Sequence, residues 1–186
     1  MMRTQSQVKN FNIPNSLSMI RIGAAPVLVF MLLAPDETMS VVSAVVFSVV
    51  CVTDWLDGYL ARRRGATTQL GKFLDPLADK ILITTVLIML IPLGRSPAWI
   101  VAAMIGREIA VTGLRAIASD MGVVIAASRL GKYKTAAQIA AIVPLMIHYP
   151  FFGFDFHLVG SALLIVALGL ALWSGVDYFI AFFRRC

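Results

Sequence analysis

Charged residues are scarce in this sequence, and their scarcity sets the class of protein. Only 14% of the 186 residues are charged and 59% are hydrophobic, whereas about one quarter of an average soluble domain is charged. The mean hydropathy is correspondingly high, at +0.85. This composition excludes an ordinary water-soluble domain and predicts an integral membrane protein.

Cysteine is almost missing, and basic residues do not interleave with aromatic ones. Cys51 lies inside an apolar segment and Cys186 is the last residue, so we expect neither a structural disulfide nor a cysteine-based metal site. The net charge of +6 therefore indicates membrane topology and attraction to anionic lipid headgroups. It does not indicate nucleic-acid binding.

Long apolar runs are abundant, and six can be distinguished. They are 13–34, 39–53, 81–93, 98–105 continuing through 109–118, 136–149 and 158–183. A spanning helix needs roughly 20 residues, so the third, fourth and fifth runs must extend into polar neighbours. Because the runs are continuous, they predict helices rather than a transmembrane barrel.

The fold class we predict is all-α, an integral membrane protein with six transmembrane helices in a single domain, 1–186. Residues 1–12 form a polar N-terminal leader. The apolar run that follows is longer than the core of a signal peptide and lacks a clear cleavage site, so we expect it to be retained.

The distribution of lysine and arginine predicts that both termini face the cytoplasm. With that orientation, 13 of the 16 basic residues fall at or near the cytoplasmic side. They are Arg3, Lys9, Arg21, Arg62, Arg63, Arg64, Lys72, Arg115, Arg129, Lys132, Lys134, Arg184 and Arg185. Of the other three, Lys80 and Arg107 lie inside spans and Arg95 lies in an outer loop.

Only ten residues are acidic, and four of them, all aspartates, fall within 26 consecutive residues next to apolar sequence. Asp54 and Asp57 are three apart, so they share one face of a helix. Asp75 and Asp79 are four apart and share a face of the next helix. Acidic residues at membrane depth are costly, and they indicate a functional site.

The two pairs of aspartates also lie at similar depths. If Arg62 and Lys72 mark the cytoplasmic interface, a rise of about 1.5 Å per residue puts the first pair about 8 and 12 Å below it, and the second about 5 and 10 Å. Carboxylates so close together repel, and divalent cations relieve the repulsion. We therefore predict two Mg²⁺ or Mn²⁺ ions, in a position to clamp a phosphoryl or pyrophosphate group. A network of salt bridges with neighbouring arginines is the structural alternative.

The acidic stretch also carries the pattern D-x2-D-G-x2-A-R-x8-G-x3-D-x3-D, and with it the chain resembles the CDP-alcohol phosphotransferase family. All eight motif positions are filled; they are Asp54, Asp57, Gly58, Ala61, Arg62, Gly71, Asp75 and Asp79. The resemblance implies a homodimer of six-helix subunits that depends on divalent metal. It also implies transfer of a phosphoalcohol group from a CDP-linked donor to an acceptor hydroxyl, with release of CMP.

The resemblance assigns roles to the motif residues by position. The metal ligands would be Asp54, Asp57, Asp75 and Asp79, and Asp79 would also be the general base toward the acceptor hydroxyl. The pocket for the CDP group would be lined by Gly58, Ala61, Arg62 and Gly71, with Lys72 as a neighbour. Small residues leave room for the ligand there, and the guanidinium meets phosphate.

Beyond the motif, most of the chain resembles the bacterial branch of this family that makes phosphatidylglycerophosphate. The matching segments are "NIPNSLSMIRI", "VTDWLDGYLARR", "GKFLDPLADK", "GREIAVTGLRAIA" and "GKYKTAAQ". This branch implies CDP-diacylglycerol as donor, the 1-hydroxyl of sn-glycerol 3-phosphate as acceptor, and a site that faces the cytoplasm in the bacterial inner membrane.

A phosphorylated acceptor requires cations beyond those that hold the donor, and the chain supplies them on the same membrane side. We expect Arg107, Arg115, Lys132, Lys134 and Thr135 to bind the acceptor phosphate. Weaker candidates for the site are Asn15, Ser18, Arg21, Glu108 and Gln138. Their structural alternatives are helix capping, snorkelling and interhelical hydrogen bonds.

Two other functions stay open from the sequence. The first is a sibling enzyme that uses inositol phosphate, serine or phosphatidylglycerol as acceptor. It stays open because the shared motif recognises only the CDP group of the donor and not the acceptor. The second is a cation transporter, which also carries carboxylates in the membrane. Transport sites usually lie near the midplane between related halves, and no second half is visible here.

Overall fold

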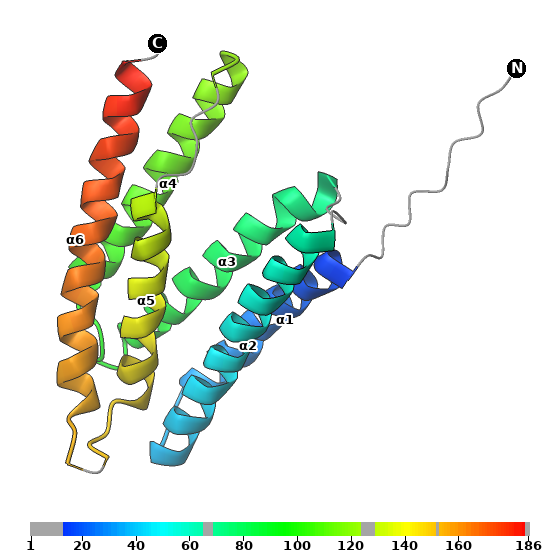
Figure 1. Cartoon of the computed structure of the whole chain (residues 1–186). Coiled ribbons are helices and arrows are strands. Elements are labelled where there is room, and N and C mark those ends of the chain that lie inside the picture. The colour runs from blue at the N-terminus through cyan, green and yellow to red at the C-terminus, as the bar shows by residue number, and fades with distance from the viewer. Residues whose placement is uncertain (1–12, 65–68, 124–128, 152, 185–186) are drawn as a thin grey trace, which may run out of the picture.

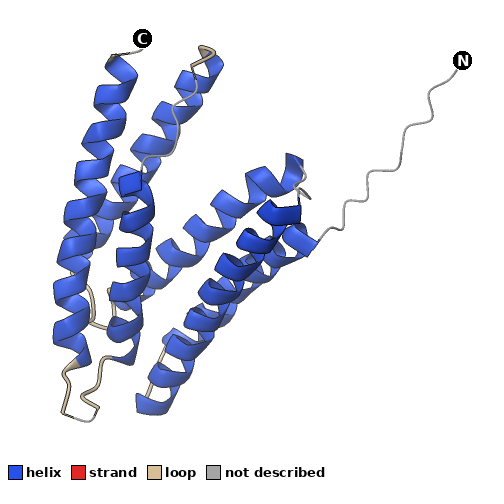
Figure 2. Cartoon of the chain, in the orientation of Figure 1, coloured by secondary structure: helices blue, strands red, loops and turns tan. Residues whose placement is uncertain are grey.

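The computed structural model describes residues 13–64, 69–123, 129–151 and 153–184, and every regular element in these ranges is a helix (Figure 2). The helices are α1 (Ile13–Leu32), α2 (Glu37–Arg64), α3 (Gln69–Leu90), α4 (Ala98–Asp120), α5 (Arg129–Ile147) and α6 (Phe156–Phe183). The all-α prediction is confirmed. The polar leader, residues 1–12, lies outside the described residues.

Successive helices run in opposite directions, and two groups can be distinguished (Figure 1). α1 packs against both α2 and α3, while α6 packs against α4 and α5. α3 crosses from the first group to the second, where it contacts α4 and α5. The end of α2 and the starts of α3 and α5 therefore lie at the same end of the bundle as the ends of α4 and α6.

Three helices are longer than the apolar runs that they contain, because each continues into polar sequence. α2 continues to Arg64, α3 begins at Gln69, and α5 begins at Arg129. The first pair of motif aspartates thus lies on α2 and the second pair on α3. Helix is the only open-ended structure that satisfies its own backbone hydrogen bonds in an apolar environment, which explains why the polar segments continue it.

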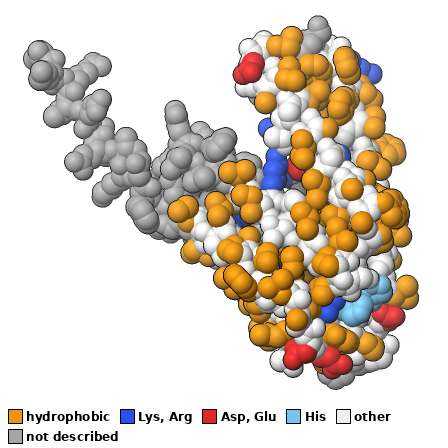
Figure 3. Space-filling view, turned by 180° about the vertical axis from the view of Figure 1, so that it is seen from behind, with side chains coloured by type: hydrophobic (Ala, Val, Ile, Leu, Met, Phe, Trp, Pro, Cys, Tyr) orange, Lys and Arg blue, Asp and Glu red, His pale blue; other side chains and the backbone are white. Residues whose placement is uncertain are grey.

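The outer surface of the bundle is rich in large apolar side chains, as Figure 3 shows. Phe30 and Trp173 are 74% and 68% exposed. Exposed apolar surface on this scale is typical of a protein that contacts lipid or a partner. By length and hydropathy alone, one helix in the described part of the chain, α6, could cross a membrane; six spans remain a prediction.

The core is formed where the two groups of helices meet. It includes Leu28 of α1, Phe47 of α2, Leu87 of α3, Met104 of α4, Leu145 of α5 and Leu164 of α6. At the end of the bundle away from the motif, Arg95 is 3% exposed. Its Nη1 donates to the Met146 carbonyl oxygen at 2.5 Å and its Nη2 to Ser40 Oγ at 2.9 Å. This residue of a predicted outer loop therefore joins the α3–α4 connection to α2 and α5.

Gly160 allows α6 to approach α5 closely. A Cβ atom at this position would lie 2.7 Å from Leu145 Cγ and 2.9 Å from the Leu145 backbone nitrogen. Gly169, two and a half turns further along the same helix, has no atom within 4 Å of such a Cβ. Glycine is thus required for packing at the first position and not at the second.

These two glycines give a matched test of the packing. We expect Gly160→Ala to destabilise the protein by about 1–3 kcal/mol, because α5 and α6 must move apart. Gly169→Ala is expected to stabilise it by roughly 0.5–1 kcal/mol, since alanine is the better helix former. Thermal unfolding in detergent measures both, and equal effects at the two positions would contradict the close contact.

Candidate functional site

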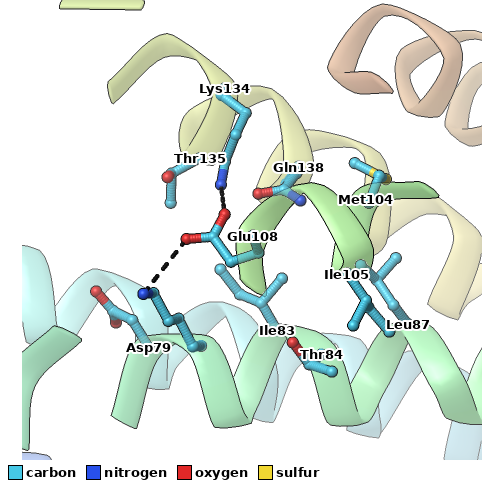
Figure 4. Close-up of a pocket in the computed structure, with 11 residues that line it drawn as sticks. Asp79, Ile83, Thr84, Leu87, Met104, Ile105, Glu108, Lys134, Thr135 and Gln138 are labelled. Carbon is cyan, nitrogen blue, oxygen red and sulfur yellow. Dashed lines mark hydrogen bonds and ion pairs between the residues drawn. The ribbon is translucent and has the colours of Figure 1, made fainter. Parts of the chain in front are cut away.

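A cavity of about 150 Å³ lies between α3, α4 and α5 (Figure 4). Its polar lining comes from all three helices; it consists of Asp79, Lys80 and Thr84 on α3, Glu108 on α4, and Lys134, Thr135 and Gln138 on α5. The rest of the wall is apolar, formed by Ile83, Leu87, Met104 and Ile105. In the space-filling view, basic and acidic side chains are visible in a hollow of an otherwise apolar surface (Figure 3).

Glu108 lies at the centre of the charged groups. Its Oε1 is 3.6 Å from Lys80 Nζ, and its Oε2 accepts from Arg107 Nη1 at 3.0 Å and from Lys134 Nζ. Lys80 Nζ also donates to Thr112 Oγ1 at 2.6 Å, which holds its ammonium toward α4. One carboxylate thus joins cations from three helices, and its side chain is 25% exposed.

Asp79, the predicted general base, is held from the first helix. Arg21 of α1 is 3% exposed, and its Nη1 donates to Asp79 Oδ1 at 2.5 Å. The Asp79 side chain itself is 46% exposed. The carboxylate is therefore oriented by one buried guanidinium and remains accessible to other groups from the cavity side.

Counted over the described residues, positive charge exceeds negative charge in the ion-pair network beside the cavity. Among the described residues, four cations (Arg21, Lys80, Arg107 and Lys134) lie within ion-pair distance of two carboxylates, Asp79 and Glu108. A site of this composition attracts anions, and a small molecule with a phosphate group would neutralise the excess.

Most of the acidic motif falls where no side chains are described. Asp54, Asp57, Gly58, Ala61, Arg62, Gly71, Lys72 and Asp75 belong to this group, as do Asn15 and Ser18 of α1. Their backbone is helical, on α1, α2 and α3. The metal and CDP assignments at these positions therefore stay predictions.

The chemistry of the donor set agrees with a hard divalent cation. By residue type, the two pairs, Asp54 with Asp57 and Asp75 with Asp79, would supply carboxylate oxygens from helical positions three and four apart. Mg²⁺ and Mn²⁺ prefer oxygen ligands of this kind, and the helical spacing predicts one shared face for both members of a pair. The residue types thus fit such ions, and the metal site stays a prediction.

The residues predicted to bind the acceptor phosphate divide into two groups. Lys134 and Thr135 line the cavity, and so do the weaker candidates Glu108 and Gln138. Because α5 begins at Arg129, Lys134 and Thr135 lie in its second turn, where they offer side chains rather than free backbone N–H groups.

Three other basic residues lie away from the cavity. Arg115 and Lys132 are exposed to the surroundings. The Arg107 guanidinium points to α6, where its Nε donates to the Ala171 carbonyl oxygen at 2.9 Å and its Nη2 to Ser174 Oγ at 2.7 Å. Besides its bond to Glu108, Arg107 lines a mostly apolar groove between α4 and α6.

Lys80 is the charged residue of the cavity wall that the sequence patterns did not assign to the site. It lines the wall and belongs to the ion-pair network of Glu108. A lysine inside a predicted span, directly after a motif aspartate, was the available signal, because charged residues at that depth usually line a polar cavity.

Comparison with known proteins extends over most of the chain. Residues 11–173 match the model of the CDP-alcohol phosphatidyltransferase family. A Bacillus subtilis protein named CDP-diacylglycerol–glycerol-3-phosphate 3-phosphatidyltransferase is 42% identical over 185 residues, covering 91% of this chain and 94% of the relative. Proteins of the same name from Pseudomonas fluorescens and Haemophilus influenzae are 38% and 36% identical, with 90% of this chain covered in each and 88% and 91% of the relatives.

Glu108→Gln tests whether the carboxylate holds the surrounding cations. The change leaves Lys80, Arg107 and Lys134 without their shared anion, so we expect a loss of roughly 1–3 kcal/mol in the free energy of unfolding. Inorganic phosphate should restore part of this stability by replacing the missing charge. Thermal unfolding in detergent, with phosphate or chloride at equal ionic strength, measures both effects.

The matched control is Glu37→Gln, at the exposed start of α2. It should change stability by less than about 1 kcal/mol and respond equally to both salts. If Glu108→Gln is as stable as the original protein, or if phosphate protects both variants to the same extent, Glu108 does not organise the site.

Proposed function

The chain belongs to the CDP-alcohol phosphatidyltransferase family, and on that premise we propose that it transfers a phosphatidyl group from CDP-diacylglycerol to sn-glycerol 3-phosphate. The products are phosphatidylglycerophosphate and CMP. The relatives of 36–42% identity that carry this activity in their names, and that align over at least 90% of the chain, support this choice of substrates.

The observation that carries the proposal is a cavity beside Asp79 with two lysines in its wall. The cavity opens beside a motif aspartate, and Lys80 and Lys134 line it. A phosphorylated acceptor needs cations of its own, because the donor pyrophosphate already occupies the groups of the CDP site. Serine would have no phosphate to place there. The electrostatics of the cavity therefore favour glycerol 3-phosphate over a neutral acceptor.

The reaction needs one proton transfer and one displacement at phosphorus. Lys80 and Lys134 would hold the acceptor phosphate, and the acceptor 1-hydroxyl would then lie beside Asp79. The Asp79 carboxylate takes the hydroxyl proton, and the hydroxyl oxygen forms a bond to the phosphorus that carries diacylglycerol. The bond from that phosphorus to the CMP oxygen breaks, and CMP leaves. Arg21 acts as a positioning residue, because it fixes the orientation of the Asp79 carboxylate.

Divalent cations would be held by Asp54, Asp57, Asp75 and Asp79. When bound, they neutralise charge on the pyrophosphate and on departing CMP. The protein contributes orientation of donor and acceptor, which brings the hydroxyl and the phosphorus into reach of each other. The apolar wall of the cavity limits access of water and so disfavours hydrolysis of the donor.

For the membrane arrangement, we propose six spans with both termini in the cytoplasm. The alternating direction of the helices supports it, because α1, α3 and α5 then begin, and α2, α4 and α6 end, at the same end of the bundle. The active site would face the cytoplasm from the bacterial inner membrane, where both the nucleotide and glycerol 3-phosphate are supplied. The homodimer implied by the family resemblance stays a prediction.

Release of CMP by the purified protein tests the proposed function. With CDP-diacylglycerol and Mg²⁺, we expect release with glycerol 3-phosphate and little with inositol phosphate, serine or phosphatidylglycerol. Removal of divalent ions with a chelator should abolish release, and Mg²⁺ or Mn²⁺ should restore it. Asp79→Asn should lower the rate by about 10²- to 10⁴-fold, because the general base and a ligand are lost together.

Asp177→Asn serves as the matched control, since this aspartate lies on α6 outside the cavity lining, and it should retain the original rate. Release with a different acceptor would overturn the choice of glycerol 3-phosphate but keep the enzyme class. No release with any acceptor, from folded and metal-loaded protein, would contradict a transferase and favour cation transport.

A further inference from the structure

The Glu108 carboxylate occupies the position between the two lysines of the cavity wall. Its Oε1 lies 3.6 Å from Lys80 Nζ, and its Oε2 accepts a hydrogen bond from Lys134 Nζ. Figure 4 shows the Lys134 side chain directed onto this carboxylate. A phosphate that contacts both ammonium groups would need the same position. Both lysines therefore already have an anionic partner in this structure, and it lies where the acceptor phosphate is expected.

Lys134 offers little room for a second anion. Its side chain is 8% exposed, and its ammonium group already donates to Glu108. A phosphate dianion placed against the same ammonium group would lie in contact with the carboxylate. Like charges at contact distance repel far more strongly in a partly buried site than in bulk water. Binding of a phosphate between the lysines therefore requires the carboxylate to leave them.

Arg107 gives the displaced carboxylate another partner. Its Nη1 donates to Glu108 Oε2 at 3.0 Å, and its side chain is 8% exposed. Its Nε and Nη2 donate to the Ala171 carbonyl oxygen and to Ser174 Oγ, at 2.9 and 2.7 Å. These two bonds hold the guanidinium against α6, outside the cavity lining. Glu108 thus keeps a cation when the lysines turn to a phosphate, and a partly buried carboxylate without one would be costly.

From this geometry we propose that Glu108 and Arg107 control access of the acceptor phosphate by an exchange of partners. In the empty site the carboxylate holds Lys80 and Lys134. When the phosphate takes these lysines, the carboxylate stays with Arg107 alone. The inference rests on the proposed function and makes both residues positioning residues of that site. The apparent affinity for phosphate is then lower than the intrinsic affinity, because only the fraction of molecules with displaced carboxylate can bind it.

Binding of inorganic phosphate to the purified protein in detergent tests the exchange. Isothermal titration calorimetry measures it at constant ionic strength, with the same Mg²⁺ concentration in every sample. Glu108→Gln removes the competing charge, so phosphate should bind about tenfold or more tightly than to the original protein. Arg107→Gln removes the partner of the displaced carboxylate, so phosphate should bind about tenfold more weakly. The control Glu37→Gln changes the net charge equally at the exposed start of α2 and should bind as the original protein does.

A double variant separates the exchange from direct phosphate binding by Arg107. If Arg107 acts only through Glu108, its loss has no further effect once the carboxylate is gone. Arg107→Gln combined with Glu108→Gln should then bind phosphate as tightly as Glu108→Gln alone. A double variant that binds about tenfold more weakly than Glu108→Gln would show that Arg107 contacts the phosphate itself, and it would overturn the exchange.

The remaining outcomes separate this inference from the proposed function. In the CMP-release assay, the KM for glycerol 3-phosphate should fall in Glu108→Gln and rise in Arg107→Gln, with smaller changes in kcat. Phosphate binding by Glu108→Gln that is unchanged or weaker would overturn the proposal, and this variant decides alone if Arg107→Gln does not fold. Tighter phosphate binding by Glu108→Gln without CMP release from any acceptor would contradict the proposed function and not the exchange of partners.

Discussion

The need to neutralise buried charge at the meeting point of α3, α4 and α5 governs this structure. Glu108 supplies the neutralising carboxylate, and it lies within ion-pair distance of Lys80, Arg107 and Lys134. Each of these cations would be costly in an apolar bundle without a partner. The shared carboxylate makes it possible to keep them close together, and their excess positive charge is what a phosphorylated substrate would neutralise.

The two ends of the bundle differ in the partners of their charged residues. At the end away from the motif, Arg95 is buried and its donors are satisfied by Met146 and Ser40. His148 lies near it in the connection after α5, and partial burial, followed by the nearby Arg95 charge, lowers the pKa of His148 below its usual value. A lowered pKa favours the neutral form of that histidine at pH 7. Among the described residues at this end, the buried cation Arg95 is engaged within the fold.

Much of this arrangement follows from the sequence, because its determinants are local. The helices follow from continuous apolar runs, and the shared faces of the aspartate pairs follow from spacings of three and four. The spacing of Lys134 and Gln138 likewise predicts one face of α5. What lies opposite that face depends on how the helices cross, and local patterns do not encode this. The pairing of Arg21 with Asp79 and the contact of Lys80 with Glu108 could not be derived from spacing, since they join residues 58 and 28 positions apart along the chain.

Arg107 is another residue whose contacts the local sequence pattern does not predict. It lies two turns before Arg115 on α4, a spacing that favours a common face, yet its guanidinium reaches α6 and bonds to Ala171 and Ser174. Gly175, where an added Cβ would lie 3.2 Å from Arg107 Cγ, leaves room for this side chain between the helices. A long side chain on a helix can turn to either neighbour, and small residues on that neighbour decide which one it contacts.

The most direct test of this account is an experimental structure of the protein in a lipid bilayer mimic with glycerol 3-phosphate bound. We expect the phosphate between Lys80 and Lys134, and the 1-hydroxyl beside Asp79. A phosphate bound instead at the exposed residues Arg115 and Lys132, with the cavity between α3, α4 and α5 free of ligand, would contradict it.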